Sequence, residues 1–212
     1  MTPIFIATSS AGKLRDFAAV AADVEVYGLP GFDSLPVAAE DGATFEENAR
    51  KKAEHYSRLA PGKLALGDDS GLEVEALGGE PGVRSARYAV DEDPEAAARG
   101  SLDQANNARL LRELANATDE ARAARFVCVI AAARDGKTLA AFRGEAAGVI
   151  ARAPRGAGGF GYDPLFYFPK LGKTFAELAP EEKAAVSHRG AAFRKFLEWY
   201  EANPAQEPGA KR

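Results

Sequence analysis

This chain of 212 residues has one cysteine, no long apolar run and no excess of positive charge. The only cysteine, Cys128, lies in the apolar run RFVCVIAAA, which excludes an internal disulfide and a cysteine-based zinc site and predicts a buried, inert thiol. No run approaches the roughly 18 apolar residues of a membrane span, and the opening MTPIFIATSS lacks the features of a signal peptide. We therefore expect a cytoplasmic protein.

The charge balance is acidic, with a formal net charge of −4 and a sequence pI of about 5.4. A broad surface for nucleic-acid polymers needs a basic face, so none is expected, and an anionic ligand would be held by a few local cations. The length and the 46% of hydrophobic residues allow a sizeable core. We expect one domain over residues 1–203, or one domain with two lobes, and a disordered tail over residues 204–212.

Apolar periodicity predicts an α/β fold with a mixed, twisted sheet and flanking helices. Strands are predicted at residues 3–7, 24–29 and 144–151, and as a hairpin of residues 125–134 and 138–143 around the turn DGK. Helices are predicted from Gly12, from Thr44 to about Ala60, within residues 94–117, and from Ser187 to about Ala202. In TFEE, Thr44 and Glu47 form a capping-box pattern.

Two adjacent acids, Asp68 and Asp69, follow an apolar run that stops at Gly67, and a second run resumes at Leu72. We expect the acids in a tight break between two strands. Neighbouring carboxylates repel each other, and burying both is unfavourable unless a cation or hydrogen-bond donors compensate. A metal site, an acid/base pair and a solvated turn all fit this pattern.

The segment TSSAGK, residues 8–13, joins a predicted strand to a predicted helix, whose first N–H groups can hold an anion. Its hydroxyls, its glycine and Lys13 suit a phosphate. The spacing of the P-loop motif is missing, and serine and threonine are common helix caps. A phosphate site and an ordinary capped loop are therefore about equally favoured.

Lys52 shares one face of the Thr44 helix with Phe45, Ala49 and Tyr56, and this face should turn inward. Local evidence favours a lysine that extends past apolar neighbours to solvent. Glu40, just before this helix, belongs to an acidic loop of a kind that is usually solvated.

Two later segments also carry candidate residues. In PRGAGGFGYDP, residues 154–164, glycines surround Phe160 and Asp163, which could stack on a nucleobase and accept from its N–H groups. A flexible loop anchored by buried aromatics is an equally good interpretation. The segment EEKAAVSHRG places Lys183, His188 and Arg189 at the start of the last helix, where cations are unusual, so a bound anion or carbonyl would explain them.

Together these features describe one ligand. Acids suit Mg²⁺, hydroxyls and lysines suit phosphates, and an aromatic side chain with polar neighbours suits a base, which are the parts of a nucleoside triphosphate site.

In order and spacing, the chain resembles the inosine triphosphate pyrophosphatase family over residues 4–199, on the motifs ATSSAGKLRDF, TFEENARKKA, GDDSGLEVEALGGEPGVRSARY, GGFGYDPLF and EEKAAVSHRG. That family hydrolyses ITP, dITP and XTP. The resemblance implies a two-lobed α/β fold with a central cleft, a homodimer, Mg²⁺ dependence, and release of pyrophosphate and a nucleoside monophosphate.

The resemblance also implies roles for individual residues. Glu40 and Asp69 match Mg²⁺ positions, and Asp69 matches the proposed base for the attacking water. Phe160 matches the residue that stacks on the purine, while His188 and Arg189 match the pair that reads its 6-oxo edge. The full set of substrate-binding positions is Thr8, Ser9, Ser10, Ala11, Gly12, Lys13, Lys52, Ser70, Phe160, Gly161, Tyr162, Asp163, Lys183, His188 and Arg189.

One position departs from the family pattern, because Ser10 stands where asparagine is usual. One sugar or phosphate contact is therefore expected to be shorter or bridged by water. On the resemblance, the paired acids are a metal site, in which Asp68 either binds the metal or only supports Asp69.

Two other functions remain open. A Maf-like pyrophosphatase for pyrimidine or modified nucleotides has a related fold, although SHR and FGYDP argue against it. A non-catalytic module that senses triphosphates is opposed only by the intact Asp69 and Glu40.

Overall fold

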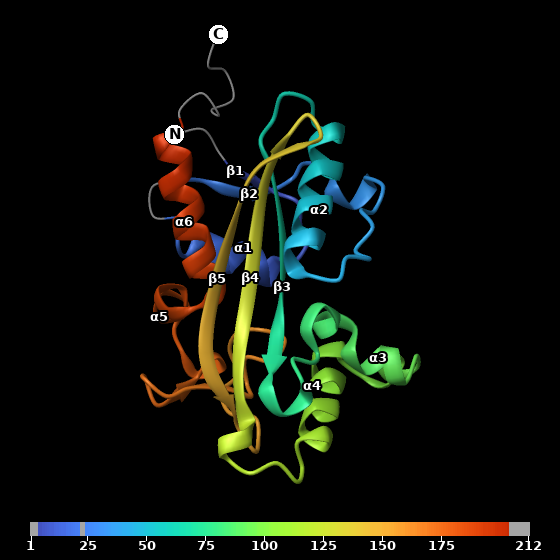
Figure 1. Ribbon diagram of the computed structural model, residues 1–212, viewed down its shortest axis with the longest axis vertical. Coiled ribbons are helices and arrows are strands. Elements are labelled where there is room, and N and C mark those ends of the chain that lie inside the picture. The colour runs from blue at the N-terminus through green and yellow to red at the C-terminus, as the bar shows by residue number, and fades with distance from the viewer. Residues whose placement is uncertain (1–3, 22–23, 204–212) are drawn as a thin grey trace. The chain divides into compact units, whose positions relative to one another are not determined.

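The structure is a computed structural model that describes residues 4–21 and 24–203. It is an α/β fold with one seven-stranded mixed sheet in the order β2-β1-β3-β4-β5-β6-β7 (Figure 1). The expected tail, residues 204–212, lies outside the described residues. No helix among the described residues has both the length and the apolar character needed to cross a membrane.

The chain divides into two compact units. The first contains residues 1–69, 128–145 and 184–212, and the second contains residues 70–127 and 146–183. Three strands contribute residues to both units: β3 (Ala65–Val74), β4 (Ala123–Arg134) and β5 (Lys137–Ile150). The seven-stranded sheet therefore contains residues of both units.

In the first unit, β1 (Ile4–Ile6) pairs in parallel with β2 (Val26–Gly28) and with β3. The two connections contain α1 (Ala11–Ala18) and α2 (Phe45–Leu59). The last helix, α6 (His188–Ala202), packs with α1 on a core to which Leu66, Ile130 and Phe193 contribute. The predicted elements at β1, α1, β2, α2 and α6 are confirmed. The apolar spacing of α1, α2 and α6 matches the faces that these helices bury.

The hairpin predicted around the turn DGK is also confirmed, and it consists of β4 and β5. Asp135 and Gly136 have φ values of 50° and 80°, as in the two-residue turns that match the twist of paired strands. However, β5 continues without interruption to Ile150, so the separate strand expected at residues 144–151 is the second half of the same strand. A Cβ at Gly144 would lie 2.2 Å from the carbonyl oxygen of His188, so β5 and the first turn of α6 meet backbone to backbone.

The capping of α2 differs in one detail from the expected box. The Glu47 N–H donates to Thr44 Oγ1 over 3.1 Å, as predicted. The Glu47 carboxylate, in return, accepts from the Ala43 N–H at 2.7 Å, one residue before the position that a capping box requires.

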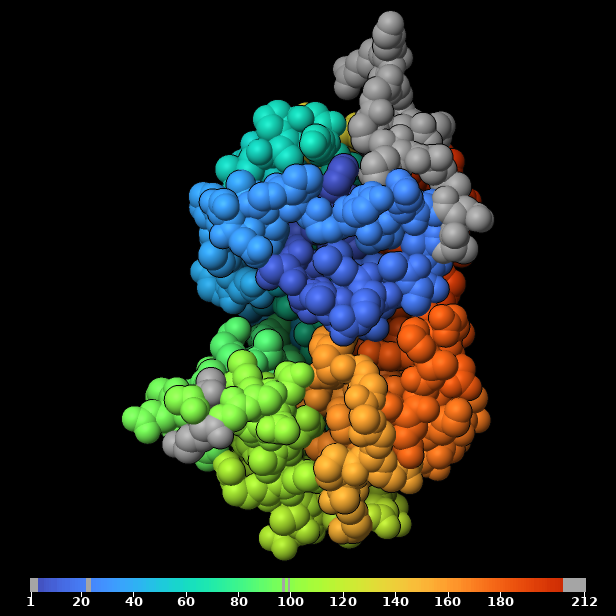
Figure 2. Space-filling view, turned by 180° about the vertical axis from the view of Figure 1, so that it is seen from behind, coloured from blue at the N-terminus to red at the C-terminus, as the bar shows by residue number. Residues whose placement is uncertain are grey.

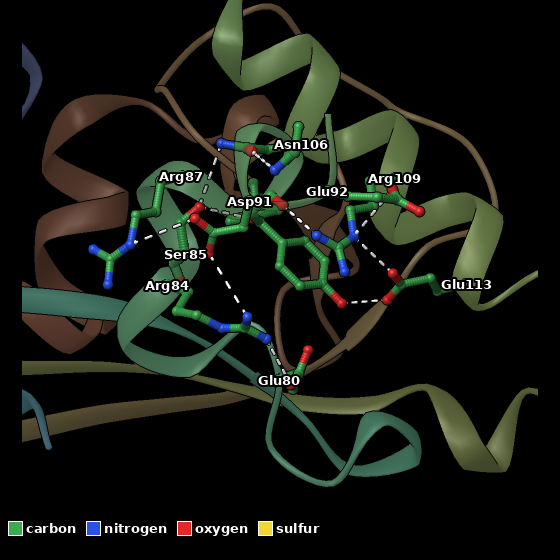
Figure 3. Close-up of polar contacts among 12 residues, drawn as sticks. Glu80, Arg84, Ser85, Arg87, Asp91, Glu92, Asn106, Arg109 and Glu113 are labelled. Carbon is green, nitrogen blue, oxygen red and sulfur yellow. Dashed lines mark hydrogen bonds and ion pairs between the residues drawn. The ribbon is translucent and has the colours of Figure 1, made fainter. Parts of the chain in front are cut away.

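The second unit contains α3 (Tyr88–Glu92), α4 (Leu102–Glu113), β6 (Phe166–Phe168), β7 (Lys173–Thr174) and α5 (Pro180–Val186). Where one or two helices were predicted within residues 94–117, the structure has a short 3₁₀ turn, Ala96–Arg99, and α4. We did not predict α3, β6 or β7, which are too short to show a clear period. Figure 3 shows ion pairs that tie this unit together, including Arg84 with Glu80 and Arg109 with Glu113, both at 2.7 Å.

Candidate active site

The paired acids lie inside an unbroken strand. Asp68 and Asp69 are in the middle of β3, which runs for ten residues, so the expected break between two strands is wrong. Successive side chains of a strand point to opposite faces, and the two carboxylates therefore have different surroundings. Each is compensated by partners on its own face, which is why strand pairing does not have to stop.

Asp68 faces the same side as Leu66, whose side chain lies in the core formed with α1 and α6. Its Oδ2 atom is 2.9 Å from the Lys13 ammonium and 3.9 Å from the Arg189 guanidinium. Burial acts to raise the pKa of Asp68, but Lys13, Arg189 and Lys52 together outweigh it, so the pKa lies below its ordinary value. Asp68 is therefore ionised and fixed.

Asp69 faces α2. The Asn48 side-chain amide donates to its Oδ2 at 3.0 Å, and the other end of that amide accepts from the Gly42 N–H at 2.8 Å. Burial raises the pKa of Asp69, and the opposing effects of Lys52 and Asn48 do not cancel it. A carboxylate with a raised pKa is a better proton acceptor than an ordinary one.

Lys52 does not extend to solvent, so that interpretation is wrong. Its ammonium group is 2.8 Å from Glu40 Oε2 and donates to the Asp68 carbonyl oxygen at 3.2 Å. Burial lowers the pKa of Lys52, but Asp68, Asp69 and Glu40 outweigh this and raise it. Lys52 therefore carries its charge between the acidic loop and β3.

The first loop is capped as a helix start. Ser10 is the N-cap of α1 and its Oγ accepts from the Lys13 N–H over 3.3 Å, while its own N–H donates to Thr8 Oγ1 at 3.1 Å. Ser9 and Ala11 are exposed. The capped-loop interpretation is thus correct locally, and the phosphate-binding role stays a prediction for the remaining groups.

His188 and Arg189 open α6, whose N-cap Ser187 accepts from the Gly190 N–H at 3.0 Å. Arg189 is 2% exposed and its guanidinium donates to Asp16 Oδ2 at 2.7 Å. Asp16 and Asp68 therefore supply the negative charge that a cation at a helix N-terminus needs. His188 is buried beside it in the first unit.

Lys183 does not lie at the start of the last helix, contrary to the sequence prediction. It lies in α5 and in the second unit, because Ser187 ends that helix and caps a new one. Its ammonium is 2.6 Å from Asp163 Oδ2 and 4.9 Å from the centre of the Phe160 ring.

The glycine-rich segment of the second unit holds Phe160 in place. Asp163 Oδ2 also accepts from the Phe160 N–H at 2.9 Å, so one oxygen binds both the lysine and the backbone. Gly159 has a φ of +71°, and a Cβ there would lie 2.1 Å from that oxygen. The part of this segment before Phe160 is exposed and lies, in orange, at the surface of its unit in Figure 2.

Tyr162 and Ser70, also predicted to bind substrate, lie in the second unit. Tyr162 is 4% exposed and its hydroxyl donates to the Ser85 carbonyl oxygen at 2.8 Å, a contact that anchors the segment. Ser70 follows Asp69 in β3 and is half-buried. Their roles toward a substrate stay predictions.

Three acidic residues of the first unit, Glu40, Asp68 and Asp69, carry the kind of oxygen atoms that bind a hard divalent cation. Oδ1 of Asp68 is buried and accepts no hydrogen bond from any residue that the structure describes. Glu40 and Asp69 add further carboxylate oxygens, the ligands that Mg²⁺ prefers. Within residues 4–21 and 24–203, no three acidic, histidine or cysteine side chains converge on one point.

Sequence reasoning missed two residues of this site, Asn48 and Asp16. Asn48 lies four residues before Lys52, and Asp16 lies three residues after Lys13, so each shares a helix face with a residue that was identified. This spacing was the available signal.

The profile of the Ham1 family matches residues 4–199. The chain belongs to the Ham1 family. The dITP/XTP pyrophosphatase of Acidobacterium capsulatum is 52% identical over 196 residues, which cover 92% of this chain and 96% of the relative. That of Geobacillus kaustophilus is 51% identical over 203 residues and 95% of each chain.

The fold of the family agrees as well. The structure of the Staphylococcus aureus Ham1 protein superposes with a TM-score of 0.78 at 42% sequence identity, covering 95% of this chain and 100% of that one. The α/β class and the family resemblance predicted from the sequence are confirmed.

Proposed function

We propose that this Ham1-family chain is a nucleoside-triphosphate pyrophosphatase that hydrolyses dITP, ITP and XTP to the monophosphate and pyrophosphate. The observation that carries the proposal is the pair of oppositely facing carboxylates in β3, with three cations, Lys13, Lys52 and Arg189, gathered around Asp68. The names of the relatives, which are dITP/XTP pyrophosphatases at up to 52% identity, support the same activity.

The first unit would supply the chemistry. Asp69, whose pKa burial raises, takes a proton from a water molecule as that water attacks the α-phosphorus. The bond from the α-phosphorus to the bridging oxygen breaks, and that oxygen leaves with the pyrophosphate. Lys13 and Lys52, which in the structure pair with Asp68 and Glu40, would neutralise the charge that develops on the phosphates.

Glu40 and Asp69 would hold Mg²⁺, which when bound neutralises phosphate charge and polarises the reacting phosphoryl group. Asp68 would contribute by holding Lys13 and Arg189 in place.

The second unit would recognise the base. Phe160 would stack on the purine. Its ring centre is 4.9 Å from the Lys183 ammonium, and its backbone N–H is held by Asp163. His188 and Arg189 of the first unit are proposed to donate to the 6-oxo group, which adenine lacks. A homodimer, implied by the family resemblance, is proposed for the assembly and can be measured by light scattering.

The test is a panel of ITP, dITP, XTP, GTP, ATP, UTP and dTTP, assayed for pyrophosphate with and without EDTA. We expect the fastest turnover for the first three and loss of turnover with EDTA. Preference for UTP or dTTP would favour a Maf-like pyrophosphatase, and binding without pyrophosphate release would favour a non-catalytic sensor.

A further inference from the structure

The peptide groups of Gly161 are held by two side chains of one helix. The Gly161 N–H donates to Asp103 Oδ2 at 2.7 Å, and its carbonyl oxygen accepts from the Asn107 side-chain amide at 2.8 Å. Asp103 and Asn107 are four residues apart in α4, so both point from the same face of that helix. Neither residue was singled out by the sequence.

The orientation of the Asn107 amide is fixed. Its nitrogen donates to the Asp103 carbonyl oxygen at 2.9 Å as well as to Gly161, and its Oδ1 is buried without a donor among the described residues. A flipped amide would place its oxygen against two carbonyl oxygens. Only a side chain that donates from this position can hold the carbonyl group.

The held glycine directly follows Phe160. Gly161 has a φ of +61°, and a Cβ there would meet no atom within 4 Å, so the backbone conformation and not lack of space requires glycine. Tyr162 is anchored to Ser85, whose carbonyl also accepts from the Asn106 amide of α4 at 3.3 Å, and Figure 3 shows Ser85 and Asn106 together. Thus α4 fixes the backbone on the C-terminal side of Phe160.

We propose that Asp103 and Asn107 are positioning residues that hold Phe160 in the conformation that stacks on the purine. Both side chains bond to the peptide groups of Gly161, so they would act on base affinity through that backbone. The inference rests on the proposed function of Phe160. It adds that two side chains of α4 hold the backbone next to Phe160.

The first variant is Asn107→Asp, which keeps the shape of the side chain but replaces the donor with an acceptor beside two carbonyl oxygens. Asp103→Asn is the milder variant, because a flipped amide can still accept from Gly161. Gln104→Ala, at an exposed position of α4, is the matched control. Circular dichroism establishes that each variant is folded.

The measurement is inhibition of ITP hydrolysis by the two products. We expect Asn107→Asp to weaken inhibition by IMP about tenfold, the loss expected for one or two hydrogen bonds, and to leave inhibition by pyrophosphate unchanged. Asp103→Asn should give a smaller loss in the same direction, and Gln104→Ala none. The Michaelis constant for ITP should rise with the IMP constant, with a smaller effect on kcat.

Unchanged IMP inhibition in a folded Asn107→Asp enzyme would overturn the inference, and so would equal weakening by both products, since this indicates general damage. Failure of the wild-type chain to release pyrophosphate from ITP would instead contradict the proposed function. The two failures are therefore distinguishable.

Discussion

The acidic cluster of the first unit and the Phe160 segment of the second are built on different principles. In the first, side-chain charges of both signs are packed together, with Asp68 and Arg189 almost fully buried. In the second, one ion pair of Asp163 and Lys183 is combined with glycines whose positive φ angles shape the backbone. The arrangement of charges thus organises the acidic cluster, and backbone conformation determines where the Phe160 ring lies in its own unit.

The largest expected effect tests the buried ion pair between Lys183 and Asp163 in the second unit. Lys183→Met leaves Asp163 buried without its cation, which should lower the free energy of unfolding by about 3–5 kcal/mol. Urea denaturation measures this. Lys173→Met removes an ion pair to Glu182 in which both side chains are nearly half exposed, so it should change stability by about 0–1 kcal/mol. Equal losses for the two variants would show that the buried pair has no special weight.

The next test addresses Asp69, the proposed base. Asp69→Asn should leave the fold intact and lower kcat by at least ~10²-fold, because an amide is a poor base and a weaker Mg²⁺ ligand. Pyrophosphate release under saturating ITP measures the loss. Turnover near that of the wild type would remove Asp69 from the mechanism.

Arg189 contacts the carboxylates of Asp16 and Asp68 in the first unit, although the family resemblance assigns it to the base. Arg189→Ala should reduce the preference for ITP over ATP by ~1–3 kcal/mol in kcat/KM if one desolvated hydrogen bond to the 6-oxo group is lost. The preference for ITP over GTP should change much less, since guanine shares that group. If kcat falls with selectivity intact, Arg189 instead supports Asp68.

The smallest effect concerns pH. The Asn48 amide stabilises the charged form of Asp69 and thereby lowers its pKa, against the larger raising effect of burial. Asn48→Ala should raise the pKa of Asp69 further, so the acidic limb of the kcat/KM profile should move to higher pH. Above that limb the base is ionised and activity should recover. Glu54→Ala, on the same helix but bonded to Thr138, is the control and should leave the limb unchanged.

The sequence predicted what depends on periodicity. The inward face of α2 and the apolar stripe of α6 repeat at helical spacing over fifteen residues each, and both helices were found. Strand β3 was misjudged at Asp68, because polar residues inside a strand look like a break until their partners are known. Those partners come from α1, α2 and α6, which are distant in sequence.

The residues of the candidate site were found by motif, and their contacts were not. Nothing local to Lys52 indicated that its ammonium would bond to Glu40 and the backbone of Asp68. Likewise, the role of Asn48 depends on which face of β3 carries Asp69. Whether such a lysine or amide is solvated or belongs to the site therefore depends on contacts with residues that are distant in sequence.

The contact at Gly144 has a consequence for how this chain tolerates change. Because β5 meets the first turn of α6 there without any side chain between them, even the methyl group of alanine must displace the turn that carries His188 and Arg189. In a library of random variants selected for activity, nearly every substitution of Gly144 should be absent, whether polar or apolar. Substitutions of the neighbouring Glu145, whose side chain is 42% exposed, should be tolerated. Such a selection would therefore find Gly144 as intolerant of substitution as a residue that contacts the nucleotide. The reason would be that the absence of a side chain at Gly144 allows β5 and α6 to approach each other.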